Sequence, residues 1–384
     1  MMSTSNFRWI VLGGFAVCVA GCDAPIARFP GNDVYALVAT KREASNDVIS
    51  LDNINAAVEK LFGTPDTPRV PDALNSLVDE SAISRTAGPQ YSDQLNTHFG
   101  LFREHCATCH GVDGSGHGPA AALLTPYPRD FRPGVFKFRS TRRSDPPTRE
   151  DLLTILDRGI PGTAMPSFAT VHEEDKDALI QYVIYLSVRG QVERSLIDLV
   201  STQEIDEVEL NNTAETLVAE IAGDWLAADS HVVNVPPAPQ SPGGEGWWTD
   251  ADLIAKGNEL FHGPVANCAS CHGPGGDGNA TTLDFDDWTK EYTTKLGITP
   301  SDKAAMKRFK AAGALSPRQS LPRKLQWGVF HGNDSDDALY RRLVTGIAGS
   351  PMPGLLLKDE NNAVGADPAD VWALVAYIRS LGKR

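Results

Sequence analysis

Apolar residues recur at helical spacing along much of this chain. One amphipathic helix is predicted over residues 46–62, because its apolar residues share one face and a Gly and a Pro follow as stop signals. Two strongly apolar helices are predicted over residues 178–188 and 371–381. Tyr185 in one matches Tyr377 in the other, each followed by an aliphatic residue, which indicates that the chain repeats itself.

The repeat covers more than these helices. Segments 128–136 and 322–330 share Pro-Arg, a large apolar residue two positions later, and Gly-Val-Phe in register. Segments 159–166 and 346–353 share the pattern Gly-Ile-x-Gly-x-x-Met-Pro. Matched features in the same order indicate two tandem copies of one domain.

Each copy contains the pentapeptide Cys-x-x-Cys-His, at residues 106–110 and 268–272. This spacing is the attachment signature of c-type haem, because two thiols three residues apart can each form a thioether with a haem vinyl group while the histidine ligates the iron. A zinc site, a redox-active dithiol and a structural disulfide are the alternatives. The sequence therefore predicts two covalently bound haem c groups, with these attachment and ligand residues: Cys106, Cys109 and His110, then Cys268, Cys271 and His272.

A haem iron that shuttles electrons needs a sixth ligand, and methionine sulfur fills this position while favouring Fe(II). Met1 and Met2 begin the chain and Met306 lies in a charged stretch, which leaves Met165 and Met352 in the two repeated loops. The Gly and Pro residues of these loops suit a close passage across a haem face. A core methionine in an ordinary loop is the alternative. Five other histidines could supply a sixth ligand, but none lies in a repeated loop: His98, His105, His117, His262 and His331.

Both copies resemble class I cytochrome c domains, in which a helix enters Cys-x-x-Cys-His, a Met-Pro loop follows, and a C-terminal helix packs an aromatic residue on the first helix. The resemblance covers residues 91–190 and 249–384 and implies an all-α fold, with one small helical domain around each haem. It also implies the iron ligands, which are His110 and Met165 in the first domain and His272 and Met352 in the second.

Arg129 and Arg323 stand at matching positions of the repeat. We expect them to contact haem propionates, because guanidinium groups pair with carboxylates through two hydrogen bonds. Local capping or pairing is the alternative. Arg129 also begins a segment, residues 129–149, with seven basic and two acidic side chains, which either steers an acidic partner or is a solvated loop.

The two copies differ in length. The distance from motif histidine to repeated Pro-Arg is 18 residues in the first copy and 50 in the second, so the second carries an insert at about 282–320. We expect this insert to be a docking element or a lid over the second haem. Residues 191–248 join the copies through an acidic segment with helical spacing and a Pro- and Gly-rich hinge, which predicts a partly helical acidic linker.

The N-terminus carries a short apolar run that ends in Val-Ala-Gly-Cys, which resembles the bacterial lipobox. Residues 1–22 are therefore expected to be a lipoprotein signal peptide, with Cys22 as the lipidated residue. An uncleaved signal anchor and an ordinary secretory signal are the alternatives, and each leads to export. We expect residues 23–90 to form a tether with one helix, which holds the first haem domain off the membrane.

A formal net charge of -14 argues against a nucleic-acid partner. We expect a membrane-tethered dihaem electron carrier on the periplasmic side, not an enzyme. Its partners would be redox proteins: a quinol-oxidising complex, a dehydrogenase, a terminal oxidase or a soluble carrier. One alternative is a dihaem peroxidase-like enzyme, which needs an open sixth position at one iron. The other is a haem subunit of a larger oxidoreductase complex, with the insert and the acidic segment as docking surfaces.

Overall fold

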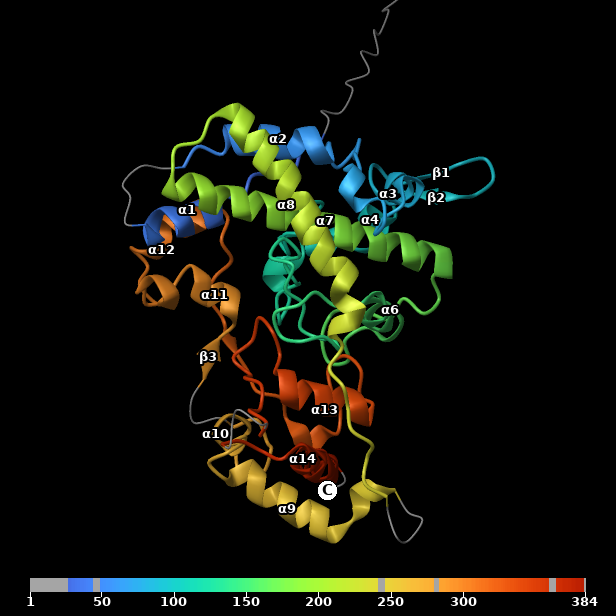
Figure 1. The fold of residues 1–384 in the computed structure, drawn as a ribbon, viewed down its shortest axis with the longest axis vertical. Coiled ribbons are helices and arrows are strands. Elements are labelled where there is room, and N and C mark those ends of the chain that lie inside the picture. The colour runs from blue at the N-terminus through green and yellow to red at the C-terminus, as the bar shows by residue number, and fades with distance from the viewer. Residues whose placement is uncertain (1–26, 44–48, 241–245, 280–282, 359–363, 383–384) are drawn as a thin grey trace, which may run out of the picture.

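The computed structural model describes residues 27–43, 49–240, 246–279, 283–358 and 364–382. Cys22 and the expected signal peptide lie outside these residues. The described chain is predominantly α-helical, with two small antiparallel sheets. In Figure 1 the first copy and the N-terminal helices form the upper part, and most of the second copy forms the lower part.

Among the described residues, ten α-helices run from the N-terminal segment to the second cysteine motif: α1 (Asp33–Arg42), α2 (Asp52–Phe62), α3 (Glu80–Thr86), α4 (Leu101–His105), α5 (Ala107–His110), α6 (Arg149–Arg158), α7 (Glu173–Thr202), α8 (Glu207–Ala227), α9 (Ala251–His262) and α10 (Ala269–His272). Four follow within the second copy: α11 (Asp287–Glu291), α12 (Met306–Ala311), α13 (Asp336–Thr345) and α14 (Pro368–Leu381). Strand β1 (Tyr91–Ser92) pairs with β2 (His98–Phe99), and β3 (Asp284–Phe285) pairs with β4 (Gln319–Ser320).

The N-terminal segment is not the tether with one helix that we expected. It contains α1, α2 and α3, which pack against α7, and apolar residues such as Val38, Val58 and Ile83 are buried there. The backbone N–H of Asn32 donates to the buried carboxylate of Glu193 on α7 over 2.9 Å. The segment folds because α7 offers apolar residues on several faces, and only one of these faces is needed by the first copy.

The helix predicted over residues 178–188 is the middle of α7, which runs on through the start of the acidic segment. Helix α8 then folds back on α7, and its buried Leu210, Val218 and Trp225 join the same core. The acidic linker is therefore helical in two pieces, as its spacing predicts.

The insert of the second copy packs on the first. Its Tyr292, Ile298, Met306 and Phe309 are buried in the core that the first copy shares with the N-terminal helices. The orange insert helices α11 and α12 rise beside α1 in Figure 1, and Arg194 of α7 forms an ion pair with Glu291 over 2.6 Å. The insert is thus a strap between the copies, and these core residues are not free to dock another protein.

The second copy has a smaller core of its own, built from α9, α13 and α14. Helices α9 and α14 cross closely at Gly257, where an added β-carbon would collide with the carbonyl oxygen of Ala373. Trp372 fills the other side of α14 against Tyr340, with ring centroids 4.9 Å apart. Across the described residues we find no helix with the length and apolarity that a membrane span requires.

Candidate haem sites

Each Cys-x-x-Cys-His motif forms a single helical turn. In the first copy the carbonyl of Cys106 accepts the N–H groups of Cys109 and His110, over 3.1 and 2.9 Å. The carbonyl of Cys268 does the same in the second copy, over 3.2 and 2.9 Å. Among the described residues, the four motif cysteines form no disulfide. The turn therefore presents two thiols and one imidazole close together, which is the donor set that haem c attachment needs.

The two motif histidines are held by the repeated arginines, through the backbone. His110 Nδ1 lies 2.9 Å from the carbonyl oxygen of Arg129, and His272 Nδ1 lies 3.0 Å from that of Arg323. A neutral imidazole that donates from Nδ1 keeps its lone pair on Nε2, the nitrogen that can then bind iron. Burial lowers the pKa of both histidines, which favours this neutral form.

The methionine loops have the same hydrogen bonds in both copies. The carbonyl oxygens of Met165 and Met352 each accept the N–H of the loop isoleucine over 3.1 Å. The hydroxyl two residues before the methionine, Thr163 or Ser350, donates to the isoleucine carbonyl over 2.8 Å. Both methionines are partly buried against the cores of their copies. The two loops are therefore equally suited to carry a sulfur ligand.

The first thiol of each motif, Cys106 or Cys268, is not activated. Burial raises the pKa of Cys106 to about 12 and that of Cys268 to about 11. A redox-active dithiol instead has a thiol whose pKa lies below the ordinary value. Within the part of the chain that the structure describes, no group of three or more His, Cys, Asp and Glu side chains could hold a metal ion. These features fit haem attachment better than the dithiol or zinc alternatives.

An aromatic pair joins the first and last helices of each copy. Phe102 packs on Tyr182 with ring centroids 5.1 Å apart, and Phe261 packs on Tyr377 with centroids 5.2 Å apart. The partner of Tyr377 in the repeat is therefore Tyr182, and our match to Tyr185 is wrong by one helical turn. Tyr185 lies further along α7 and donates its hydroxyl to the carbonyl of Phe62, in the N-terminal helices.

The side chains of the two repeated arginines lie at the boundary between the copies. The guanidinium of Arg129 stacks on Trp288 of the insert, with Cζ 4.5 Å from the ring centroid, and its Nη2 has no hydrogen-bond partner within the described residues. Arg323 donates to the carbonyl of Val329 and lies 2.7 Å from Nε2 of His331. Contact with a haem propionate stays a prediction for both. Sequence reasoning missed the backbone role of these arginines, although their repeated position signalled that they have a common function.

The basic segment 129–149 faces the second copy. Arg143 donates to the carbonyl of Met352 over 2.9 Å, and Phe138 packs edge-on against His331. A small cavity between the copies is lined by Lys137 and Arg342, among others, and burial lowers the pKa of Lys137 to about 8. Part of the segment is therefore buried between the copies, whereas Arg142, Arg143 and Arg149 are exposed, and the steering of an acidic partner by these three side chains stays a prediction.

Of the five other histidines, His331 lies beside Arg323, as described above, and the remaining four have partners away from the methionine loops. Both ring nitrogens of His262 lie 2.9 Å from carbonyl oxygens, and Nδ1 of His117 lies 2.8 Å from the carbonyl of Ser115. Nδ1 of His98 lies 3.3 Å from Glu104, and Nε2 of His105 lies 4.0 Å from the same carboxylate.

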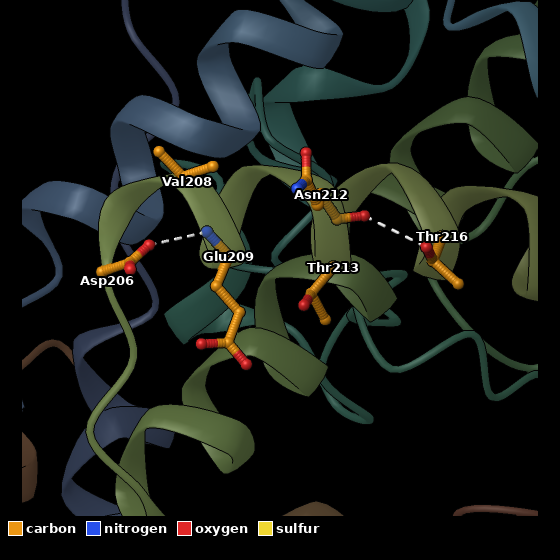
Figure 2. Close-up of a pocket in the computed structure, with 6 residues that line it drawn as sticks. All are labelled: Asp206, Val208, Glu209, Asn212, Thr213 and Thr216. Atoms are coloured by element: carbon orange, nitrogen blue, oxygen red, sulfur yellow. Dashed lines mark hydrogen bonds between the residues drawn. The ribbon is translucent and has the colours of Figure 1, made fainter.

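A second hollow lies on the exposed face of α8 and is shown in Figure 2. Its polar side chains serve the helix itself, because Asp206 accepts the N–H of Glu209 and Thr216 donates to the carbonyl of Asn212. It contains no residue of the cysteine motifs or the methionine loops, so it takes no part in the candidate chemistry.

Comparisons with known proteins find two cytochrome c-type family models along the chain. The family model described as cytochrome C oxidase, cbb3-type, subunit III matches residues 93–183, and the model described as cytochrome c matches residues 254–382. A solved chain from the reducing HAO-like protein complex of Kuenenia stuttgartiensis is 20% identical, with a TM-score of 0.48 over 73% of this chain and 94% of that chain. No curated protein matches.

Proposed function

Two cytochrome c domains follow one another in this chain and bind two haem c groups covalently, and from this premise we propose that the protein is a lipid-anchored electron carrier outside the cytoplasm. One-electron exchange between Fe(III) and Fe(II) is the chemistry that bound haem c supplies. The protein supplies the ligands, their orientation and the surroundings that exclude water.

We assign the thioether bonds to Cys106 and Cys109 in the first domain and to Cys268 and Cys271 in the second. His110 and His272 are the nitrogen ligands, and the carbonyl on Nδ1 fixes the tautomer and makes Nε2 a better donor. Met165 and Met352 are the sulfur ligands. Sulfur from these two residues would favour Fe(II) and would occupy the position that peroxide needs.

One observation carries the proposal, namely that both domains have the same histidine support and the same methionine loop, bond for bond. A peroxidase-like enzyme needs two unlike irons, one of them open to substrate. Two sites with the same set of donor residues instead suit a carrier, in which the second haem would shorten each electron-transfer step.

The location and partners are proposed from the sequence. The apolar N-terminal run and its lipobox-like end support export and lipidation at Cys22. Export also agrees with the attachment of haem c outside the cytoplasm. The partners would be redox proteins near the membrane, as donors a quinol-oxidising complex or a dehydrogenase and as acceptors a terminal oxidase or a soluble carrier.

Absorption spectroscopy of the purified holoprotein tests the ligand assignment. Methionine ligation of Fe(III) gives a weak charge-transfer band in the red, and Met165→Ala and Met352→Ala should each remove about half of it. A resting high-spin haem that turns over peroxide would overturn the proposed carrier function.

Mass spectrometry of the mature protein, with Cys22→Ser as the control, tests the lipid anchor separately.

A further inference from the structure

The repeated arginines engage both copies at once, and this arrangement is reciprocal. The backbone carbonyl of Arg129 holds the histidine of the first domain, while its side chain reaches the methionine loop of the second. Arg323 does the reverse, with its carbonyl on the histidine of the second domain and its side chain at the methionine loop of the first.

The contact from the first domain to the second is made at Gly349. A β-carbon added there would lie 2.6 Å from Nη1 of Arg129, which is closer than a side chain permits. Gly349 also has a φ of 69°, a conformation that favours glycine. Position 349 is three residues before Met352, so the guanidinium lies against the loop that carries the proposed sulfur ligand.

The contact from the second domain to the first is made at Gly162, the matching glycine. An added β-carbon would lie 2.9 Å from both Nη1 and Nη2 of Arg323, and the φ of Gly162 is 80°. Position 162 is three residues before Met165. The same glycine of each loop thus leaves room for the arginine of the other domain.

Among the described residues, the loop of the second domain accepts hydrogen bonds from an additional arginine, and the loop of the first domain has no such contact. Arg143 donates from Nη1 to the carbonyl of Met352 over 2.9 Å and from Nη2 to that of Ser350 over 3.3 Å. The N–H of Asp287, at the start of α11, also lies 3.4 Å from the carbonyl of Gly349. The second methionine loop is therefore held by hydrogen bonds from the first domain and the insert. The first methionine loop has fewer contacts of this kind with the second domain.

Burial makes the charge of Arg129 effective at this site. Asp286 and Asp287 of the insert are the acidic groups nearest to it from the second copy, with Asp130 from its own domain. Burial lowers the pKa of Arg129 to about 10, so its side chain is still a cation at neutral pH. A cation in poorly hydrated surroundings acts on neighbouring charge changes more strongly than a solvated one.

We propose that Arg129 and Arg323 are positioning residues exchanged between the two domains, each of which supports the nitrogen ligand of its own haem and the sulfur-ligand loop of the other. This inference rests on the methionine ligation proposed above. Each guanidinium then favours Fe(II) at the opposite haem, because a nearby cation opposes the additional positive charge of Fe(III). The affinity of one haem for an electron therefore depends on the docking of the other domain.

The test uses Arg129→Gln and Arg323→Gln in the full-length holoprotein, which keep both backbone carbonyls. The ε-methyl protons of an iron-bound methionine resonate far upfield in the Fe(II) state, and Met165→Ala and Met352→Ala assign the two signals. We expect Arg129→Gln to shift the Met352 signal and Arg323→Gln to shift the Met165 signal. In redox titrations followed by these signals, Arg129→Gln should lower the Fe(II) to Fe(III) ratio of the opposite haem about tenfold at fixed potential, which is 59 mV for one electron. Arg323→Gln should lower the ratio at its opposite haem by a smaller factor, because Arg323 is less buried.

Arg149→Gln is the matched control, because it removes the same charge from an arginine that is paired with Asp177 within the first domain. It should leave both signals in place. Arg143→Gln supplies a second variant from a less buried side chain, and it should shift the Met352 signal alone.

Three results would overturn the proposed exchange of arginines between the domains. The methionine signal and the Fe(II) to Fe(III) ratio could change more at the haem of the variant's own domain, change equally at both haems, or change at neither. If the unmodified protein has no methionine signals, the ligand assignment fails instead, so the two proposals can be told apart. Arg129→Lys keeps the charge without the planar group, so the second haem should keep most of the electron affinity that it loses in Arg129→Gln.

Discussion

The two cytochrome c domains share their haem-binding elements but differ in what surrounds them. The first domain shares one core with the N-terminal helices, α8 and the insert, whereas the second has a smaller core around α14, with Val235 and Ala238 of the linker packed against it. Their histidine supports and methionine loops nevertheless have matching hydrogen bonds. The comparison teaches that the local chemistry of a haem site is conserved within this chain while the packing that supports it is not.

Phe131 and Leu325 illustrate the difference near the ligands. Both follow the repeated arginine by two positions, and the N–H of each donates to a matching glycine, over 2.8 and 2.7 Å. Phe131 stacks on the ring of His110, with centroids 4.6 Å apart. The second domain has an aliphatic side chain here, so the two haems need not have equal potentials even with identical ligands.

The largest predicted effect separates the shared core from the second domain. Glu193→Ala removes the carboxylate that pairs with Arg189 and accepts the N–H of Asn32, and it leaves a buried guanidinium unpaired. We expect the free energy of unfolding of the shared core to fall by about 3–5 kcal/mol. Hydrogen exchange measured peptide by peptide should show the loss in α1, α2 and α7 but not in α14. Glu215→Ala, on the exposed face of α8, is the control, and an equally small effect of both would contradict the anchoring of α1.

A second prediction destabilises the second domain alone. Gly257→Ala places a methyl group against the carbonyl of Ala373 where α9 crosses α14, which should cost about 1–3 kcal/mol. Gly223→Ala is the matched change in α8, where an added β-carbon has no neighbour within 4 Å, and it should stabilise by about 0.5–1 kcal/mol. Denaturant unfolding combined with hydrogen exchange measures both. If Gly257→Ala lowers protection in α7 as strongly as in α14, the domains do not have separate cores.

A third prediction makes the domains more alike. Phe131→Leu gives the first domain the residue of the second and removes the ring stacked on His110, at a cost of about 1 kcal/mol. The potential of the first haem should move toward that of the second, as read from a redox titration. The reverse change, Leu325→Phe, should move the second haem toward the first. Unchanged potentials in both variants would exclude this pair of residues as a source of the difference.

The smallest predicted effect concerns Asp79, the N-cap of α3. Hydrogen bonds from Ser81 and from the N–H of Ala82 hold the pKa of this carboxyl below its ordinary value of 3.8. Its contribution to stability is therefore complete above that value and is lost as the pH falls through the lower, folded-state pKa. Asp79→Asn should remove this pH dependence of exchange in α3. The control is Asp250→Asn, at the N-cap of α9, which should leave hydrogen exchange in α3 unchanged.

The haem-binding motifs and the methionine loops could be identified from sequence, because each is a short segment in which residue type and spacing express the chemistry. The packing of residues 27–90 could not. Ile54 and Val58 indicate an apolar face in α2, but nothing in the sequence says that α7 covers it. The insert was also ambiguous, since Tyr292 and Phe309 fit a lid, a docking element or the strap that the structure contains.

The arginine carbonyls were missed for a different reason. Every residue has a backbone carbonyl oxygen, so the hydrogen bond between His110 and the carbonyl of Arg129 cannot be predicted from residue type. The repeated Pro-Arg is the one sequence feature that accompanies it. The match of Tyr185 to Tyr377 failed because α7 carries tyrosines one turn apart, at 182 and 185, and only the first packs on the Phe of its own domain.

The strap, whose buried residues lie within 292–309, also constrains the order in which the chain can be assembled. Synthesis proceeds from the N-terminus, so α1 and α7 emerge about 90 residues or more before the side chains of Tyr292 and Met306 that complete their core. The second cysteine motif emerges before the strap as well. The first domain therefore reaches its final form only after both haem attachment segments have been made, which delays its maturation until nearly the whole protein is available.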